Sequence, residues 1–367
     1  MTVTTSLSAK LGDLDLGVPL AVGTLQWGTT GLFHSDRILA EDVCRDIVQE
    51  LTAANVRLFD TAEGYGGGTS EKRLGRLLSV PSQQHLIMTK FLPAPWRGLW
   101  DCDFERAVQQ SCQRLGVNKI HVYLLHSPVH WRPIEYWVQQ AAACRAKGWF
   151  DYFGLSNANA DQVRRAVAAG NKYGIRVVCN QVHYSLLDYQ SPALQEMQAV
   201  CEELDVHIIG FTPIGQGLLC DNLTDEKFEK NLARRMLRVQ RTELDTLRGV
   251  LSRLATQYEK SMAQVALNWC LQHNVIPLVG CRSVQQARDS VGGVGWTLAA
   301  ADVQALDEVA LAKSTLESPT WRRALFVTLF GVVNVVCKAL DAWGWGRLDL
   351  LREKKEESTT EISAKQE

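Results

Sequence analysis

The chain has 367 residues, of which 46% are hydrophobic, and its formal net charge is −1. A chain of this length can bury a sizeable core, either as one large domain with appendages or as two or three smaller domains. The near-zero charge gives no overall attraction to nucleic acid or to anionic lipid. Ten scattered cysteines, without a Cys-x-x-Cys motif or paired Cys/His spacing, favour free thiols over disulfides or a zinc site.

The N-terminal residues MTVTTSLSAK lack the apolar run of a secretory signal and the long Arg/Ser-rich stretch of a transit peptide. We therefore expect a cytoplasmic protein. A plastid location is the alternative, because a chain from which a transit peptide had been removed would look the same.

Eight short β-rich runs alternate with amphipathic stretches along the chain. Most of them are almost continuously apolar, as expected of parallel strands that are covered on both faces. Their starts lie about 25 to 36 residues apart, the length of one strand–helix unit, except before the last run. The predicted strands are residues 20–23, 56–60, 85–91, 121–126, 152–156, 177–181, 207–211 and 276–279.

The intervening segments carry helical periodicity. Val43, Ile47 and Leu51 repeat at i, i+4 and i+8, and a comparable face spans residues 163–173 with Asp161 near its start. Further helices are predicted over residues 104–115, 134–146, 192–203, 242–257 and 262–273.

This alternation predicts an α/β protein, a closed (β/α)8 TIM barrel over residues 1–313. The longer connection at residues 217–241 is interpreted as an insertion over the C-terminal face, where barrel enzymes carry substrate loops. The main alternative is an open doubly wound sheet. Such a sheet usually has a Gly-rich turn after its first strand, and no G-x-G-x-x-G occurs there.

The composition changes after about residue 313. Residues 324–337 (ALFVTLFGVVNVVC) are apolar, and a helix over them would span about 21 Å, short of the ~30 Å hydrocarbon core of a bilayer. We predict a helical C-terminal extension over residues 314–350 and a disordered charged tail over 351–367. Three roles stay open for the extension: packing on the barrel or in an oligomer, peripheral membrane contact through residues 321–345, and a true span.

Four residues suited to proton transfer lie at or just after the ends of three successive predicted strands. Asp60 ends the first strand and Tyr65 follows it in a Gly-rich loop, Lys90 lies near the end of the second, and His126 ends the third. In a parallel barrel all these ends point to one face. A tyrosine ordinarily has a pKa of about 10, which a neighbouring ammonium lowers while a carboxylate holds the lysine. Histidine can then donate to a substrate carbonyl oxygen.

Each of these residues also has a structural interpretation. Asp60 could cap a helix, Lys90 could be a solvated strand end, His126 could be satisfied by backbone, and Tyr65 could lie on a loop surface. Their coincidence on three successive strand ends favours the catalytic interpretation.

The segments FDTAEGYG, TKF and LLHSP resemble the signature blocks of the aldo-keto reductase superfamily. The resemblance extends from about residue 18 to residue 312, and TKFLPAPWR and VALNWCL are similar to the plant and cyanobacterial branch that includes pyridoxal reductase-like members. Later blocks match in order: GLSNANADQ (154–162), NQVHYSLL (180–187), GFTPIGQGLL (210–219), AQVALNWCLQ (263–272) and PLVGCRSVQQARDS (277–290).

The resemblance implies that Tyr65 is the general acid of carbonyl reduction, that Asp60 and Lys90 tune it, and that His126 orients the substrate. It also implies an NADPH/NADP+ cofactor. The residues implied to bind this cofactor are Thr24, Ser156, Asn157, Gln181, Phe211, Arg282, Ser283, Gln286 and Asp289.

These cofactor positions divide into two groups. Ser156, Asn157 and Gln181 match positions that hydrogen-bond the nicotinamide carboxamide, and Phe211 matches an aromatic position that stacks on the ring. Arg282 and Ser283 match the site that binds the adenosine 2′-phosphate, which favours NADPH over NADH. Gln286 and Asp289 would lie near the adenine. Ser283 is also a suitable helix N-cap, and the two roles are compatible.

Two positions depart from the family pattern at the expected substrate pocket. Leu25 and Ser127 stand where many relatives carry tryptophan, so two pocket walls are predicted to be less bulky. Trp27, Trp96 and the insertion at residues 217–241 would form other walls, although each tryptophan could equally pack at the barrel rim.

The sequence therefore predicts an oxidoreductase of the alcohol dehydrogenase (NADP+) type that reduces an aldehyde or ketone, with a small carbonyl compound as partner and neither nucleic acid nor metal. The alternative resembles potassium-channel β subunits, redox-sensing barrels that act mainly through partners; steady multiple turnover would count against it. A barrel metal enzyme would need a His/Asp cluster that the sequence lacks. The substrate, oligomeric state and organelle are left open.

Overall fold

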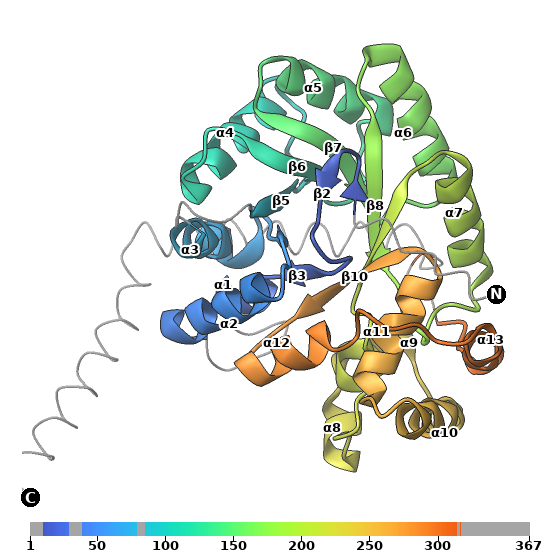
Figure 1. The fold of residues 1–367 in the computed structure, drawn as a ribbon. Helices are drawn as coiled ribbons and strands as arrows, with labels where there is room; N and C mark the ends of the chain where they lie inside the picture. The colour runs from blue at the N-terminus through green and yellow to red at the C-terminus, as the bar shows by residue number, and fades with distance from the viewer. Residues whose placement is uncertain (1–9, 29–38, 79–84, 314–315, 317–367) are drawn as a thin grey trace, which may run out of the picture.

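The computed structural model describes residues 10–28, 39–78, 85–313 and 316. Within them, eight parallel strands form a closed barrel in the order β10-β3-β4-β5-β6-β7-β8-β9 (Figure 1). The predicted (β/α)8 TIM barrel is confirmed. The strands are β3 (Ala21–Gly23), β4 (Leu58–Asp60), β5 (Leu86–Phe91), β6 (Ile120–Leu125), β7 (Phe150–Ser156), β8 (Val177–His183), β9 (His207–Phe211) and β10 (Val275–Gly280).

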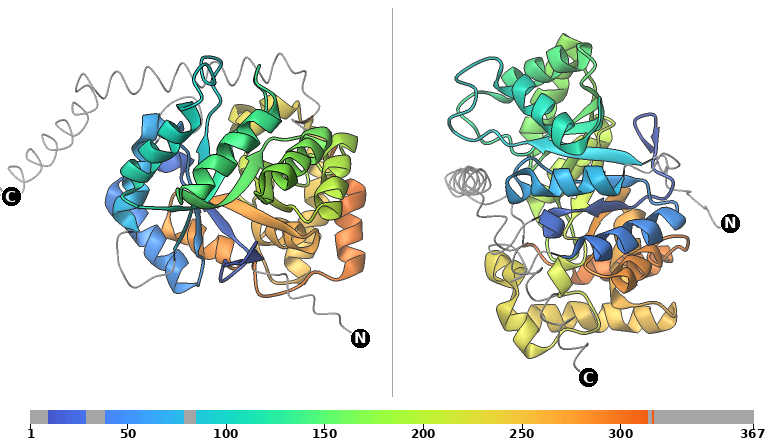
Figure 2. Two further views of the ribbon diagram at one scale, coloured as in Figure 1. Left: turned by 90° about the horizontal axis from the view of Figure 1, so that it is seen from above. Right: turned by 90° about the vertical axis from the view of Figure 1, so that its left-hand side faces the viewer.

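Helices surround the strands, as the views in Figure 2 show. Helices at the predicted places begin and end within about two residues of their predicted bounds, the ordinary uncertainty of helix ends. They are α2 (Glu41–Ala53), α4 (Asp103–Leu115), α5 (Ile134–Ala146), α6 (Ala160–Tyr173), α7 (Pro192–Glu203), α10 (Arg241–Gln257) and α11 (Met262–Gln272). The remaining helices are α1 (Leu25–Gly28), α3 (Thr69–Leu77), α8 (Asp225–Lys230), α9 (Leu232–Leu237), α12 (Val284–Val291) and α13 (Ala300–Val309).

A short hairpin precedes the barrel and was not predicted. Strands β1 (Lys10–Leu11) and β2 (Leu14–Asp15) pair antiparallel. Leu11 and Leu16 are buried and belong to the same apolar cluster as the barrel interior. Strands of two residues leave no periodic signal in the sequence, although their apolar side chains contribute to the core.

Two apolar layers hold the barrel together. One fills its interior with residues such as Met88, Leu124 and Ile209. The other packs helix faces, such as those of Ile47 and Leu51, against the outside of the strands. Because side chains alternate along a strand, Lys90 in β5 faces the same way as Leu86 and Met88 and so points into the barrel, one layer nearer its C-terminal mouth.

Side-chain caps fix where several helices begin. Asn159 and Gln162 form a reciprocal capping box at the start of α6, and Ser261 and Gln264 form another at α11. Ser283 accepts a hydrogen bond from the backbone N–H of Gln286 at the start of α12. Each cap satisfies backbone donors that a helix N-terminus leaves without partners.

The connection between β9 and α10 contains α8 and α9, so the predicted insertion is a helical excursion that leaves the C-terminal end of β9. Its beginning is held by Arg248, whose guanidinium donates to the carbonyl oxygens of Leu218 and Cys220. Asp221 accepts a hydrogen bond from the backbone N–H of Met262.

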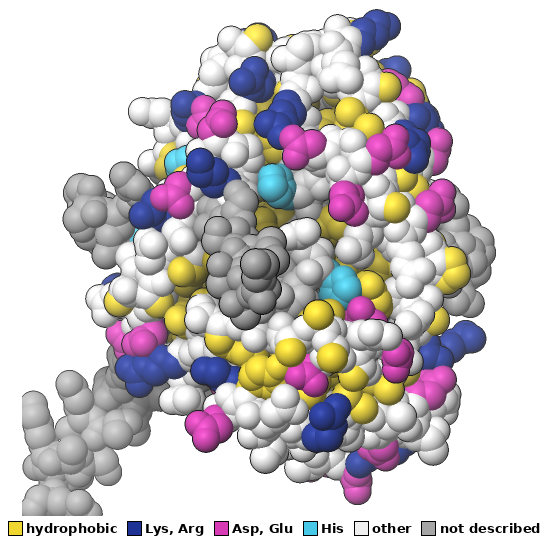
Figure 3. Space-filling model, turned by 45° about the vertical axis from the view of Figure 1, so that its right-hand side comes forward, with side chains coloured by type: hydrophobic (Ala, Val, Ile, Leu, Met, Phe, Trp, Pro, Cys, Tyr) yellow, Lys and Arg dark blue, Asp and Glu magenta, His cyan; other side chains and the backbone are white. Residues whose placement is uncertain are grey.

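Lys, Arg, Asp and Glu side chains intermingle over the face shown in Figure 3, in keeping with the near-zero net charge. Within the described part of the chain, the cysteines are free thiols. No helix there has the length and apolar character needed to cross a membrane. The predicted C-terminal extension and charged tail lie outside the described residues, apart from Leu316, which is buried.

Candidate active site

Asp60, Tyr65, Lys90 and His126 meet at the C-terminal mouth of the barrel. The Lys90 ammonium donates to Asp60 Oδ2 at 2.7 Å and to the Tyr65 hydroxyl at 3.1 Å. The Tyr65 and His126 rings lie edge to face, with centroids 5.8 Å apart. Residues that are up to 66 positions apart in the sequence thus form one contiguous constellation, as the strand ends predicted.

Glycines set the path of the chain that carries Tyr65. The 3-10 turn η1 (Tyr65–Gly68) contains Gly66 at φ 58°, Gly67 at φ 65° and Gly68 at φ 98°, values that residues with a side chain rarely adopt. A Cβ atom on Gly66 would also lie 1.7 Å from the carbonyl oxygen of Gly28. The run of three glycines therefore lets the loop turn back and place the Tyr65 hydroxyl over Lys90.

Lys90 and Asp60 form a buried ion pair, with side chains 0% and 2% exposed. Burial by itself lowers the pKa of Lys90, but Asp60 and Tyr65 raise it, and the net direction is upward. Lys90 also donates to the carbonyl oxygen of Thr61 at 2.8 Å, and Gln181 donates to Asp60 Oδ1 at 3.0 Å. Such additional hydrogen bonds are what a buried charge pair requires, so Lys90 stays an ammonium at neutral pH.

The protonation of Tyr65 differs from our expectation. Burial raises the pKa of Tyr65 above its ordinary value, and Lys90 lowers it only in part. Tyr65 therefore carries its proton throughout the physiological range, which is the state a proton donor needs. Burial, helped by the Lys90 charge, holds the pKa of His126 well below its ordinary value, so this imidazole is neutral.

A hydrogen-bonded hub beneath the constellation joins three elements. Ser70 Oγ, in α3, donates to the carbonyl oxygen of Thr24 and accepts from the Thr61 hydroxyl, both at 2.9 Å. The Thr24 hydroxyl in turn lies 2.7 Å from Ser70 Oγ and donates to the carbonyl oxygen of Asp60. The hydroxyl of Thr24 thus ties the ends of β3 and β4 together, and cofactor contact by Thr24 stays a prediction.

The residues predicted to bind the nicotinamide lie beside the constellation. Strand pairing places Ser156 next to Gln181, and Asn157 N–H donates to the Gln181 carbonyl oxygen. Asn157 has φ 59° and donates through Nδ2 to the His126 carbonyl oxygen at 3.1 Å. Phe211 ends β9 and is half-buried at the mouth. The structure brings these four residues together at one end of the barrel.

The residues predicted to bind the adenosine end lie where β10 leads into α12. Arg282 and Ser283 are half-buried and Gln286 is exposed. Gln286 Oε1 accepts from the backbone N–H of Arg282 at 2.8 Å, and Gln286 N–H donates to Ser283 Oγ. Asp289 accepts from the Ser261 hydroxyl at 2.9 Å, which ties α12 to the start of α11. These hydrogen bonds fix the start of α12, and phosphate binding there stays a prediction.

Gln26, in α1, borders the end of β10. Gln26 Oε1 is buried without a hydrogen-bond partner among the described residues. The Gln26 amide borders Gly280, the last residue of β10, where a Cβ atom would lie 3.5 Å from Gln26 Nε2. An orphaned buried amide oxygen is a group to which a donor on a bound polar ligand could supply the missing hydrogen bond.

The predicted substrate-pocket residues take different positions. Ser127 is nearly buried and accepts a hydrogen bond from the Val129 N–H, and Leu25 is half-buried in α1. Trp96 is 39% exposed on the β5–α4 connection. Trp27 is fully buried in the layer between strands and helices, and its indole donates to the Cys281 carbonyl oxygen. Trp27 therefore packs at the rim and does not form an open pocket wall.

A second buried ion pair adjoins the constellation and was not singled out from the sequence. Glu63 is fully buried, accepts from the Leu92 N–H at 2.8 Å and pairs with Arg97 at 2.6 Å. It fastens the β4–α3 loop, which carries Tyr65, to the β5–α4 connection. Glu63 lies inside the FDTAEGYG block, where a second acid three residues after Asp60 is the signal that could have identified it.

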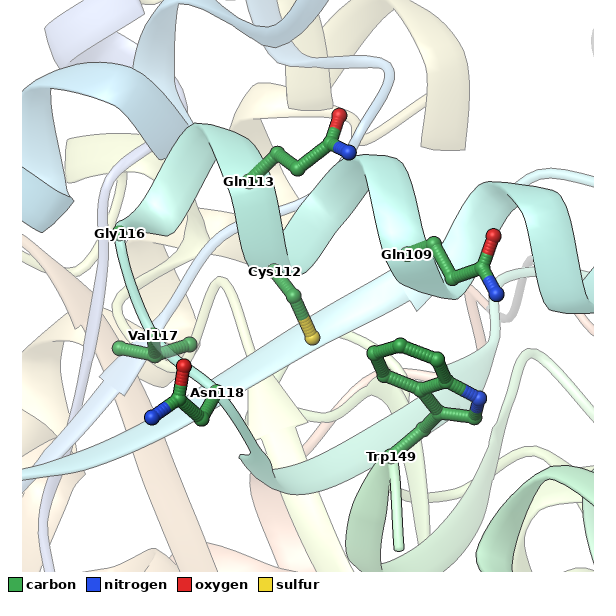
Figure 4. A pocket seen from close by; sticks show the side chains of 7 residues that line it. All are labelled: Gln109, Cys112, Gln113, Gly116, Val117, Asn118 and Trp149. Carbon is green, nitrogen blue, oxygen red and sulfur yellow. The ribbon is translucent and has the colours of Figure 1, made fainter. Parts of the chain in front are cut away.

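A shallow pocket of about 570 Å³ lies at the opposite end of the barrel (Figure 4). It is formed where α4 leads into β6 and where β7 begins, which are N-terminal strand ends. The lining residues are Gln109, Cys112, Gln113, Gly116, Val117, Asn118 and Trp149. None of the predicted site residues lines it. Among the described side chains, no group of three or more His, Cys, Asp or Glu is arranged to hold a metal ion.

The chain belongs to the aldo/keto reductase family, whose family model matches residues 19–311. It is 28% identical over 302 residues to the chloroplastic pyridoxal reductase of Arabidopsis thaliana, an alignment that covers 79% of this chain and 82% of that protein. The family assignment makes the chain an oxidoreductase and confirms the resemblance on which the site prediction rests.

Two solved structures share the fold. An aldo-keto reductase from Bacillus halodurans in its holo form matches with a TM-score of 0.67 and 23% identity, covering 83% of this chain and 96% of that one. A Bombyx mori aldo-keto reductase in complex with NADP matches with a TM-score of 0.62 and 22% identity, covering 84% and 93%. At these identities the likeness concerns the fold alone.

Proposed function

We propose that this protein reduces an aldehyde or ketone to the alcohol, with NADPH as the hydride donor and Tyr65 as the proton donor. The observation that carries the proposal is the contact of the Tyr65 hydroxyl with the Lys90 ammonium, itself paired with Asp60, beside a neutral His126. A protonated phenol next to a fixed positive charge is suited to give up a proton as negative charge develops on a carbonyl oxygen.

Each of the four residues has a separate role in the proposed reaction. Tyr65 transfers its phenolic proton to the carbonyl oxygen. The Lys90 ammonium, 3.1 Å from the Tyr65 oxygen, stabilises the resulting phenolate. Asp60 keeps Lys90 charged and in place through the 2.7 Å ion pair. Neutral His126 donates a hydrogen bond that orients the carbonyl. Asp60 and Lys90 are buried, which strengthens their electrostatic contact because little water competes, whereas Tyr65 and His126 are half-buried.

The cofactor would be held by two groups of residues, one for each of its ends. Ser156, Asn157 and Gln181 would bind the carboxamide, Phe211 would stack on the nicotinamide, and Arg282 with Ser283 would bind the 2′-phosphate at the start of α12. When bound, NADPH supplies the hydride. A guanidinium at the phosphate end is the reason to prefer NADPH over NADH.

The test is a panel of carbonyl compounds that includes pyridoxal, small aldehydes, quinones and sugars, followed through NADPH absorbance with NADH as control. We expect steady multiple turnover with at least one carbonyl and a lower KM for NADPH than for NADH. NADPH oxidation limited to a single turnover would instead favour a redox-sensing barrel that acts through partners.

Tyr65→Phe provides the matched variant, because it removes one oxygen atom and keeps the ring beside His126. We expect turnover to be lost and the Kd for NADPH to change by less than about two-fold, since the hydroxyl acts on the reacting oxygen. Tyr258→Phe, at the C-terminal end of α10, is the control and should retain turnover. Retained turnover in Tyr65→Phe would remove Tyr65 from the mechanism.

A further inference from the structure

A buried histidine–carboxylate pair lies at the barrel mouth and has no part in the proposed proton transfer. His183 is the last residue of β8, two positions beyond Gln181 on the same face of the strand. His183 Nδ1 lies 2.6 Å from Asp188 Oδ2, and the side chains are 7% and 0% exposed. Because a carboxylate accepts, the proton of this bond belongs to Nδ1.

Asp188 is held in place by the loop that follows β8. Its Oδ1 accepts from the backbone N–H of Ser185 at 2.7 Å and from the Ser185 hydroxyl at 3.0 Å. The Ser185 hydroxyl oxygen also accepts from the Leu187 N–H. With His183 as third donor, the buried carboxylate is well satisfied, so the loop gives the imidazole one fixed orientation.

The loop itself is fastened by the segment that follows α13. The backbone N–H groups of Leu311 and Lys313 donate to the carbonyl oxygens of Leu186 and Leu187 at 2.8 and 3.0 Å, and Gln190 N–H donates back to Leu311 at 3.0 Å. Every residue from Tyr184 to Asp188 is buried. Loops ordinarily run over the protein surface. Because this loop is buried, it acts as a rigid support.

The imidazole that this support fixes meets the ring of Phe211. Strand pairing sets His183 directly beside Phe211, and the two ring centroids lie 5.5 Å apart at 84°. That is the edge-to-face arrangement in which the positive edge of one ring meets the negative face of another. A chain of contacts therefore runs from Asp188 through His183 to the ring of Phe211.

We propose that His183 is a positioning residue of the cofactor site, which holds the Phe211 ring at the angle required to stack on the nicotinamide. The inference rests on the proposed function, because it takes Phe211 as the stacking residue. It assigns the β8–α7 loop a role in cofactor geometry, and it predicts an effect confined to the nicotinamide end.

His183→Asn tests the proposal, because the asparagine amide can still donate to Asp188 whereas the ring beside Phe211 is lost. The readout is the Kd for NADPH and for adenosine 2′,5′-bisphosphate, which lacks the nicotinamide. An aromatic pair contributes enough to predict a two- to ten-fold weaker Kd for NADPH. We expect the Kd for the bisphosphate to be unchanged. His207→Asn, at the opposite end of β9, is the matched control.

Two further variants separate ring positioning from general damage. Phe211→Ala should weaken NADPH binding, and adding His183→Asn to it should cause no further loss, because the two act as one unit. His183→Phe keeps a ring beside Phe211 and should bind NADPH within about two-fold of wild type. If His183→Asn does not fold, His183→Gln takes its place, because it also removes the ring and can still donate to Asp188.

The outcomes are distinct. If the wild-type protein binds no NADPH, the proposed function is contradicted. Wild-type protein that binds it, with His183→Asn unchanged, would overturn only the role of His183. Equal losses for NADPH and the bisphosphate, or additive losses in the double variant, would show a general structural effect and would also overturn it.

Discussion

The two ends of the proposed cofactor site are built differently. At the reacting end, Lys90 and Asp60 are almost completely buried and ion-paired. At the phosphate end, Arg282 is half-buried and Gln286 is exposed, and the hydrogen bonds described there are made with the helix start itself. The first end is part of the folded core, whereas the second is a surface feature attached to a helix N-terminus.

This difference separates chemistry from binding. Charges inside the barrel are fixed before any ligand arrives, so in the proposed reaction they would act without reorganisation. A side chain at the start of α12 would contribute to the proposed phosphate affinity but adds little to the core. Variants at the reacting end should therefore change turnover and stability, whereas variants at the phosphate end should change cofactor affinity.

Lys90→Met should have the largest effect. It leaves Asp60 buried without its partner, a change that costs about 3–5 kcal/mol in the free energy of unfolding. It also removes the charge beside Tyr65, so turnover should be lost. Urea unfolding and NADPH-coupled turnover are the measurements. Lys147→Met, which breaks an exposed pair with Glu105, is the control and should change neither. A stable and active Lys90→Met would contradict the account.

Arg282→Gln should have an intermediate effect, confined to cofactor affinity. Loss of a charge-assisted hydrogen bond to the 2′-phosphate predicts about a 10- to 100-fold higher KM for NADPH with kcat unchanged. The KM for NADH should not change. Arg288→Gln is the matched control within α12, where Arg288 pairs with Glu50, and it should leave both KM values as they are. A lower kcat in Arg282→Gln would contradict the proposal that the phosphate end affects only cofactor affinity.

The smallest expected effect is the pH dependence of stability that His126 causes. Burial and Lys90 hold the pKa of His126 well below about 6.5, the value expected in the unfolded chain. Below pH 6.5 the unfolded chain therefore binds a proton at His126 that the folded protein does not bind. The free energy of unfolding decreases as the pH is lowered from 6.5 toward the pKa of His126 in the folded state. Above pH 6.5 both states are neutral, so no loss occurs.

The measurement is urea unfolding at pH 7.5 and 5.5. Between these values wild type should lose up to about 1.4 kcal/mol more stability than His126→Gln, because one such proton counts at most that much per pH unit. Other buried histidines remain in both proteins and cancel. An equal loss in the two proteins would mean that His126 titrates normally in the folded state.

The sequence predicted the barrel and the meeting of the four mouth residues because both follow from periodicity and strand direction. Continuous apolar runs identified the strands, and a parallel barrel brings their ends to one face. The raised pKa of Tyr65 did not follow, because it depends on how completely the loop excludes water. The Ser70 hub and the Glu63–Arg97 pair also depend on packing between elements that are distant in sequence. His183 and Asp188 lie only five residues apart, yet nothing in NQVHYSLLD signals that the loop folds back.

The most direct test of the central claim is single-turnover oxidation of bound NADPH by a carbonyl from the panel, measured in parallel with NADPH binding for wild type and Tyr65→Phe. We predict that both proteins bind NADPH with similar Kd values and that only wild type oxidises it at an appreciable rate. Oxidation by Tyr65→Phe at the wild-type rate would show that the proton comes from another group and would contradict the proposed chemistry.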